Sequence, residues 1–247
     1  MKYENTPYSF EGKTMLVTGS SRGIGAATAR LAKQYGAKVI LHGKTDSQPL
    51  KDLAKELDSG YIFCDAADEW AIIREVGKLG GIDILVNNAG INPSKKFMDL
   101  TNDDWSRIYS VNLMGPVNFS RAVIPGMQDR GHGRIINISS AKGYNHVTGK
   151  PAYAASKAAL MRLTTSMAQE FAPHILVNSV APGFTKTEMT AGTMSPQIQG
   201  QIDKIPLRRM ANAREIAEVV LFLASDNASY ITGQTIAVDG GFSIISG

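Results

Sequence analysis

The sequence contains only one cysteine, Cys64. A lone cysteine cannot form a disulfide within the chain, so the sequence gives no sign of an oxidising compartment. We expect Cys64 to be a buried strand residue rather than a reactive thiol. Long apolar runs are missing too: no segment approaches the roughly 18 apolar residues of a membrane-spanning helix. The N-terminal stretch MKYENTPYSFEGK also lacks the apolar core of a signal peptide. We therefore expect a soluble, cytoplasmic protein without a membrane partner.

Large clusters of one charge are absent as well. The net charge is +4, but the basic residues are scattered and no stripe of basic and aromatic residues is present. Nucleic acid is therefore not an expected partner, and the mild positive charge only modestly favours anionic ligands. We find no repeats and no low-complexity tract. With 247 residues, 43% hydrophobic and 19% charged, we expect one domain over residues 1–247 that folds without a partner.

Short β-branched and aliphatic runs alternate with longer segments of helical periodicity. Seven predicted strands cover Lys13–Thr18, Lys38–His42, Tyr61–Cys64, Ile82–Asn87, Arg134–Ser139, Ile175–Val180 and Thr235–Val238. Predicted helices cover Gly23–Tyr35, Gln48–Leu57, Asp68–Leu79, Asp103–Met127, Ala152–Phe171 and Ala213–Ala224. Several strands are apolar almost throughout, which is typical of strands covered on both faces. The pattern predicts an α/β, doubly wound (Rossmann) fold with about seven parallel strands and helices on both faces.

Two segments carry additional local signals. Thr101 and Asn102 precede Asp103 and Asp104, which is typical of a helix N-terminus because side-chain oxygens accept free backbone N–H groups. Residues 184–207 combine threonine, glycine, methionine, serine and proline with weak periodicity. We expect this second segment to be a mobile substrate lid outside the sheet.

A glycine-rich turn follows the first predicted strand and opens a helix. It runs from Thr18 through Gly19, Ser21, Arg22, Gly23 and Ile24 to Gly25. Without a Cβ, glycine lets backbone N–H groups and the positive helix end approach a pyrophosphate closely. The alternative is a tight turn selected only for packing. The strand before it and the helix after it favour a dinucleotide-binding site.

The end of the second strand would contact the ribose 2′ position. It reads His42-Gly43-Lys44, with no acid to hydrogen-bond a 2′-hydroxyl. Gly43 leaves room for a phosphate, and Lys44 with Arg22 supplies positive charge, so NADP(H) is favoured over NAD(H). The alternative is that Lys44 is a solvated loop residue and Asp46 turns inward, which would permit NAD(H).

Two further strand ends complete the predicted cofactor groove. Asp65 and Ala66 follow the third strand, where the carboxylate would accept from an adenine amino group or would instead cap a helix. Asn88, Ala89 and Gly90 follow the fourth strand, where small residues let the backbone lie against a cofactor.

Tyr153 and Lys157 are four residues apart on a predicted helix and so share one face. Ser140 follows the fifth strand, and Asn112 lies in the helix before it. Hydride reduction of a ketone builds negative charge on oxygen, which requires a donor and an acid. A nearby ammonium lowers the pKa of a phenol, so Lys157 would activate Tyr153. Ser140 would donate to the substrate oxygen, and Asn112 would hold a water that connects Lys157 to solvent.

Together these motifs resemble the short-chain dehydrogenase/reductase family, in its compact single-domain branch, over nearly the whole chain. The resemblance implies a catalytic tetrad of Asn112, Ser140, Tyr153 and Lys157, with Lys157 also binding the nicotinamide ribose. It further implies a nicotinamide-facing loop that includes Pro182, Gly183, Thr185 and Thr187. The implied reaction is metal-free hydride transfer to or from a small carbonyl or alcohol substrate, commonly in a homo-oligomer, a tetramer or a dimer.

The closing segment SDNASYITGQTIAVDGGFSI is similar to that of bacterial 3-oxoacyl-carrier-protein reductases. Those enzymes usually carry basic residues near the active site to dock an acidic carrier, whereas the turn Phe171–Ile175 is short and lacks arginine; Arg130 would have to serve. The polar loop Ala141–Lys150, with Tyr144, Asn145, His146 and Thr148, would instead suit a free polyol, sugar or small keto compound, unless it is only a solvated surface loop.

Two other functions compete with a reductase. A dinucleotide-sensing protein without chemistry would not need the proton donor that the tetrad provides. An epimerase or dehydratase of the longer-chain relatives would need a larger C-terminal substrate region than 247 residues allow.

Overall fold

The computed structural model describes residues 8–144, 149–188 and 195–244. Its main sheet contains seven parallel strands in the order β3-β2-β1-β4-β5-β6-β9. They are β1 (Thr14–Val17), β2 (Lys38–Gly43), β3 (Gly60–Phe63), β4 (Ile84–Asn87), β5 (Gly133–Ile138), β6 (Ile175–Pro182) and β9 (Thr235–Val238). Every predicted strand is present, with ends within two residues of the predicted positions.

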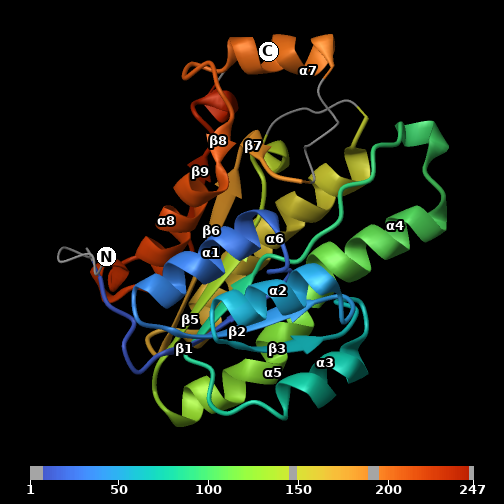
Figure 1. Ribbon diagram of the computed structural model, residues 1–247. Helices are drawn as coiled ribbons and strands as arrows, with labels where there is room; N and C mark the ends of the chain where they lie inside the picture. Colours follow the sequence, from blue (N-terminus) through green and yellow to red (C-terminus); the bar gives the residue numbers. More distant parts are fainter. Residues whose placement is uncertain (1–7, 145–148, 189–194, 245–247) are drawn as a thin grey trace.

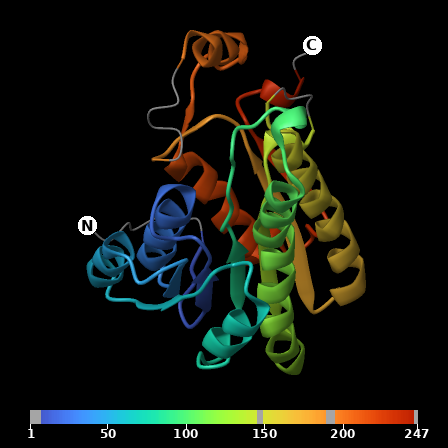
Figure 2. The same ribbon diagram turned by 90° about the vertical axis from the view of Figure 1, so that its right-hand side faces the viewer.

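Helices cover both faces of this sheet, as predicted (Figure 2). One face holds α1 (Gly23–Gln34), α2 (Gln48–Glu56) and α8 (Ala213–Ala224); the other holds α3 (Glu69–Val76), α5 (Gly115–Asp129) and α6 (Pro151–Phe171). Strand side chains alternate between the two: Met15 and Val17 pack on the first side and Leu16 on the second. Because both sides are covered, the central strands have no polar face, which explains their nearly continuous apolar sequence.

The predicted helix Asp103–Met127 is wrong as one continuous element. The structure has α4 (Asn102–Tyr109), a π-helical turn over Ser110–Met114, and then α5. Pro116 has no N–H to donate to the Asn112 carbonyl, so the regular bonding pattern cannot pass this point. Widening of the helix by one π turn is the local solution, and such turns are frequent at functional sites. The N-terminus of α4 is confirmed, since Thr101 and Asp104 form a capping box.

Residues 184–207 lie outside the main sheet, as expected (Figure 1). They contain β7 (Thr185–Lys186), which pairs with β8 (Ala211–Asn212), and α7 (Pro196–Lys204), neither of which the weak periodicity indicated. Figure 1 shows α7 standing apart from the sheet and its covering helices. Residues 189–194 of the predicted lid are outside the described part of the chain. Short 3-10 segments at Phe97–Asp99, Ala141–Gly143, Asp226–Ala228 and Phe242–Ile244 were also not predicted.

The strand order reverses between β1 and β4. From β1 the chain builds outward through β2 and β3, and from β4 it builds the other way through β5, β6 and β9. In open α/β sheets the ligand crevice lies outside the carboxyl ends of the strands at this reversal. The fold therefore directs attention to the loops that follow β1 and β4. Among the described helices, none combines the length and apolarity needed to cross a bilayer.

Candidate active site

The glycine turn after β1 packs against the loop after β4. Gly19 has a φ of +62°, and a Cβ there would lie 2.8 Å from the Ala89 Cα. A Cβ on Gly25 would lie 2.5 Å from the Asn88 Nδ2 and from the Gly19 carbonyl oxygen. Since real Cβ atoms do not approach so closely, both positions require glycine. These two glycines therefore serve packing on the side of the turn that faces β4, and the approach of a pyrophosphate to the turn stays a prediction.

Hydrogen bonds hold the two loops together. Thr18 Oγ1 accepts from the backbone N–H groups of Asn88 (2.9 Å) and Ala89 (3.0 Å). The Asn88 amide nitrogen donates to the Thr18 and Gly19 carbonyls at 2.9 and 3.0 Å. Asn88 and Ala89 were predicted as cofactor contacts. In the structure the Asn88 side chain is a clamp that fixes the shape of the glycine turn.

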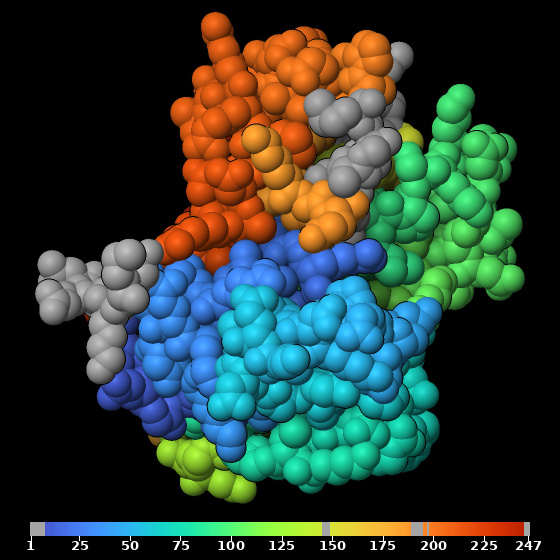
Figure 3. Space-filling view, viewed as in Figure 1, coloured from blue at the N-terminus to red at the C-terminus, as the bar shows by residue number. Residues whose placement is uncertain are grey.

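The N-terminal end of α1 is open to a ligand. Its N-cap residue, Arg22, is extended and exposed and makes no capping hydrogen bond, and the first turn contains no acid. Free N–H groups and the positive helix end suit a pyrophosphate. Thr187 lies above this turn, with its methyl carbon 3.3 Å from the Cβ position of Gly23. In Figure 3 the orange residues after β6 lie directly over the blue residues of this region. Ser21 and Ile24, the other predicted contacts, are half-buried.

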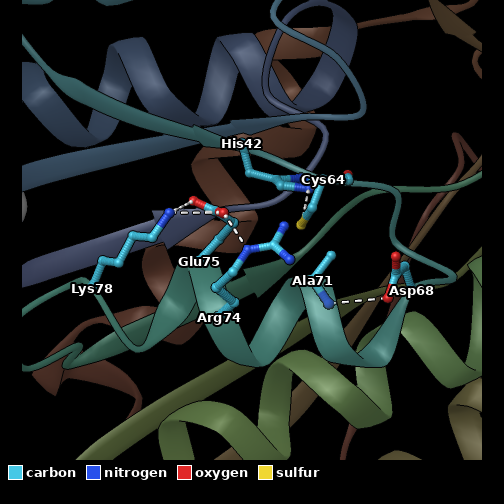
Figure 4. A network of polar contacts seen from close by, with 7 residues as sticks. All are labelled: His42, Cys64, Asp68, Ala71, Arg74, Glu75 and Lys78. Carbon is cyan, nitrogen blue, oxygen red and sulfur yellow. Dashed lines mark hydrogen bonds and ion pairs between the residues drawn. The ribbon is translucent and has the colours of Figure 1, made fainter.

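His42 holds the turn from the other side. Its buried ring accepts at Nδ1 from the Gly19 N–H (3.1 Å), so the ring proton belongs on Nε2, which donates to the Cys64 carbonyl (3.0 Å). Burial lowers the pKa of His42 to about 4, which keeps the ring neutral. Figure 4 shows the ring beside Cys64. His42 thus positions the glycine turn, and its ring nitrogens are already occupied by protein partners. Cys64 is buried, and burial raises its thiol pKa to about 11, as expected of a structural cysteine.

Charged residues surround the end of β2 and β3. Lys44 Nζ lies 3.4 Å from an Asp65 oxygen, and Arg107 of α4 donates to the same carboxylate at 2.8 Å. Burial would raise the pKa of Asp65, but the hydrogen bonds from Arg107 and from a backbone N–H lower it below its ordinary value. The alternative in which Asp65 caps a helix is wrong, because Asp68 is the N-cap of α3 (Figure 4). Arg107 was not predicted, since its distance in sequence from Asp65 hides the contact.

Two predicted backbone positions contribute by their shape. Gly43 ends β2, where a Cβ would lie 2.9 Å from the Leu50 side chain. The Ala66 carbonyl lies 2.8 Å from the Cβ position of Gly115, so the loop after β3 packs tightly against the start of α5. The loops after β2 and β3 are thereby fixed beside the glycine turn.

Ser140 and Tyr153 lie together at the carboxyl end of β5. Ser140 is the buried N-cap residue of the 3-10 turn Ala141–Gly143, and Tyr153 is in the first turn of α6. The Ser140 hydroxyl is close enough to the Tyr153 phenol to affect its pKa. Burial raises the pKa of the Tyr153 phenol, and the hydrogen bond with Ser140 partly offsets this rise. Two hydroxyl groups that lie close together can both donate hydrogen bonds to the oxygen of a reacting carbonyl.

Lys157 lies one helical turn from Tyr153. Its buried ammonium donates to the Ile138 carbonyl at 2.7 Å and lies 5.9 Å from the centre of the Tyr153 ring. Burial lowers the pKa of Lys157 to about 8. The expected lowering of the phenol pKa by Lys157 is not found in this structure, because the ammonium is directed at the Ile138 carbonyl and burial dominates at Tyr153.

Asn112 projects from the π turn to the loop after β4. Its Oδ1 accepts from the Ile91 N–H (2.9 Å), and its Nδ2 donates to the Ile91 carbonyl (3.0 Å) and to Ser156 Oγ (3.1 Å). A Cβ on Gly90 would lie 3.3 Å from Asn112 Oδ1 and 3.5 Å from Lys157 Nζ. Asn112 thus places this loop next to Lys157, while a water held by Asn112 stays a prediction. Ser156 was not predicted, and nothing in its sequence context distinguishes it.

The predicted nicotinamide-facing loop begins where β6 ends. Pro182 is paired with Val238 of β9, and a Cβ on Gly183 would lie 2.7 Å from the Asp239 Cα. Thr185 is buried and donates to the Gly183 carbonyl at 3.2 Å. All the predicted site residues therefore follow parallel strands at one edge of the sheet or line the helices beside it. Among the described residues, no group of three His, Cys, Asp or Glu side chains is arranged to hold a metal ion.

Comparisons with known proteins agree with this geometry. A family model described as enoyl-(acyl carrier protein) reductase matches residues 19–243. The chain is 41% identical to the 3-oxoacyl-[acyl-carrier-protein] reductase of Vibrio cholerae over 96% of this chain and 100% of that protein. A solved short chain dehydrogenase/reductase family protein superposes with a TM-score of 0.90 at 38% identity, covering 96% of this chain and 100% of the other. A gluconate 5-dehydrogenase of Burkholderia cenocepacia, solved with NADP and tartrate, gives 0.92 at 32% identity, covering 96% and 98%.

Because His42 is buried and neutral, we expect the free energy of unfolding to depend on pH. Its folded-state pKa of about 4 lies below the ordinary value of 6.5, so the unfolded chain binds this proton more tightly. The neutral His42 ring therefore makes its full contribution to stability above about pH 6.5, and this contribution is lost as the pH falls toward 4. Between about pH 7 and pH 5, the wild type should lose about 2 kcal/mol more unfolding free energy than His42→Gln. Urea unfolding at the two pH values measures this, and equal losses in both proteins would contradict the assignment.

Proposed function

Since the chain belongs to the short-chain dehydrogenase/reductase family, oxidoreductases acting on CH–OH and C=O groups, we propose that it transfers a hydride between NADP(H) and a small carbonyl or alcohol substrate, with Tyr153 as the general acid or base. The observation that carries this proposal is the closeness of the Ser140 hydroxyl to the Tyr153 phenol, with Lys157 one helical turn away. This pair lies at the same edge of the sheet as the glycine turn.

The residues at this edge fit a dinucleotide. Glycine at positions 19 and 25 lets the turn pack against the loop after β4, and the open end of α1 would take the pyrophosphate. Lys157 would bind the nicotinamide ribose, and Thr185 and Thr187 would hold the carboxamide. When bound, the nicotinamide would supply or accept the hydride.

The protein's own groups would manage the charge and the proton. During reduction negative charge grows on the substrate oxygen, and the Ser140 and Tyr153 hydroxyls would donate to it. The raised pKa of Tyr153 keeps the phenol protonated in the free protein, so the acid form is ready for reduction. As Tyr153 releases its proton, the positive charge of Lys157, 5.9 Å from the ring centre, would stabilise the phenolate.

The end of β2 supports NADP(H) over NAD(H). Asp46, the acid that would have favoured NAD(H), is ion-paired with Lys51 at 2.7 Å and accepts from the Tyr61 hydroxyl at 3.1 Å. It is therefore engaged away from the ribose position. Lys44, which pairs with Asp65, and Arg22 at the start of α1 would supply the positive charge for a 2′-phosphate.

A 3-oxoacyl-thioester reductase is the second candidate, supported by the identity with carrier-protein reductases over nearly the full chain. Against docking of an acidic carrier, Arg130 is occupied within the protein: its guanidinium pairs with Asp83 at 3.4 Å and donates to the Ile82 carbonyl. Of the predicted polar loop, residues 145–148 lie outside the described part of the chain. A purely dinucleotide-sensing protein would not need the Ser140–Tyr153 pair. The homo-oligomer stays a prediction.

Replacing Tyr153 by phenylalanine tests the proton-transfer role. Tyr153→Phe should lower kcat by about 10²- to 10⁴-fold, because the proton donor is lost, while the Kd for NADPH changes by no more than about twofold. Tyr230→Phe, at a fully exposed tyrosine outside the predicted site, is the matched control and should keep full activity. Steady-state assays at 340 nm and fluorescence titration give both quantities. A Tyr153→Phe enzyme with a tenth or more of wild-type kcat would refute the role.

Cofactor choice rests on Arg22 and Lys44. The double variant Arg22→Ala/Lys44→Ala should raise the Kd for NADPH about tenfold and leave that for NADH nearly unchanged, because only the 2′-phosphate needs these cations. Lys55→Ala, at an exposed lysine of α2, should alter neither constant. Isothermal titration with both cofactors decides the matter, and tighter binding of NADH than NADPH to the wild type would overturn the preference.

A further inference from the structure

The segment around Tyr153 contains basic residues but no acidic residue. Residues 130–169 contain six lysines and arginines and no aspartate or glutamate. Two of the six are paired with acids from elsewhere, Arg130 with Asp83 and Arg134 with Asp226. Lys142 and Lys150, by contrast, form no ion pair with any described residue. Both lie between Ser140 and Tyr153 in the sequence.

Lys142 is held rigidly next to Ser140. Its backbone N–H donates to Ser140 Oγ at 3.2 Å within the 3-10 turn Ala141–Gly143. This turn packs closely on α6, since a Cβ on Gly143 would lie 3.1 Å from the Ala158 backbone nitrogen. The Lys142 ammonium lies 5.5 Å from the centre of the Phe184 ring, at the start of the loop that follows β6. Its position is therefore fixed on two sides, by α6 and by Phe184.

Lys150 is the second lysine and lies at the start of α6. It is the N-cap residue, three positions before Tyr153, and its carbonyl accepts from the Ala154 N–H at 3.0 Å. Both lysines are half-buried. Burial and the charge of Lys150 lower the pKa of Lys142 to about 8, and burial lowers that of Lys150. Two partly desolvated ammonium groups that repel each other are unfavourable until an anion joins them.

Neither the side chains of the two internal undescribed segments nor the expected sites of the cofactor phosphates supply this anion. The undescribed segments 145–148 and 189–194 contain no acidic residue. The phosphate groups of a dinucleotide would be held at the α1 end and beside Lys44, after β1 and β2, whereas Lys142 follows β5 and Lys150 starts α6. Ser140 and Tyr153 mark the place of the reacting carbonyl, so an anion near the two lysines would be part of the substrate.

We propose that the substrate carries an anionic group, a carboxylate or a phosphate, a few atoms from its reacting carbonyl carbon, and that Lys142 and Lys150 bind this group. The proposal rests on the proposed reductase function and adds to it the class of substrate. Lysine binds either anion as a point charge, so both chemistries are included. The two ammonium groups act as specificity-determining residues beside the catalytic pair.

Pairs of substrates that differ mainly in one negatively charged group test the proposal. A series of oxo acids with increasing separation of carbonyl and carboxylate is compared with the methyl esters, and dihydroxyacetone phosphate with dihydroxyacetone, all with NADPH. For the best anion, kcat/KM should exceed that of its neutral partner by at least about tenfold. Lys142→Met and Lys150→Met should each lower kcat/KM for the anion about tenfold, mainly through KM, and change the neutral partner by less than about twofold.

Control variants distinguish a failure of this proposal from a failure of the proposed reductase function. Lys142→Arg should retain most of the preference for the anion, Lys55→Met should change nothing, and the Kd for NADPH should be the same in every variant. Neutral compounds reduced as well as their anionic partners, or equal losses on both in Lys142→Met, would overturn the anionic-substrate proposal and leave the reductase function standing. Reduction of neither member of any pair by a protein that binds NADPH would refute the reductase function, and this proposal with it.

Discussion

The hydrogen bonds between Thr18 and Asn88 are the constraint on which the rest of the site depends. They join the loops after β1 and β4, two strands that are neighbours in the sheet but separated in the chain by three helices and two strands. Because the strand order reverses between these strands, no other strand end fills the gap. The turn can pack against the loop after β4 only with glycine at positions 19 and 25. The Asn88 hydrogen bonds therefore depend on these two glycines.

The catalytic side chains are placed by elements that pack around this gap. The π turn before Pro116 carries Asn112, which fixes Ile91 and brings Gly90 against Lys157. The helix α6 carries Tyr153 and Lys157, and the 3-10 turn after β5 brings Ser140 to the phenol. Lys142 and Lys150, which form no ion pair with any described residue, lie between Ser140 and Tyr153 in the sequence. The protonated phenol and the two lysines are the features on which the proposed reduction of a negatively charged carbonyl compound rests.

Much of this arrangement follows from sequence pattern alone. Buried strands such as β4 could be predicted because they are continuous apolar runs that end in turn residues. The helix N-terminus at Thr101 could be predicted because its capping box involves only four adjacent residues. The interruption at Asn112 could not, because a helical period continues through Ser110–Met114 and only the missing N–H of Pro116 reveals it. Side-chain partners such as Arg107 with Asp65 depend on tertiary packing. For the same reason His42, expected to contact a cofactor, is a buried tie between strands.

The most direct test of this account is NADPH binding by an Asn88→Ala protein. The substitution removes two hydrogen bonds that shape the glycine turn but no group expected to touch the reacting carbonyl. The account predicts a Kd for NADPH raised by at least about tenfold, with circular dichroism unchanged, because the turn is no longer held against β4. An Asn88→Ala protein that folds normally and binds NADPH with wild-type affinity would contradict it.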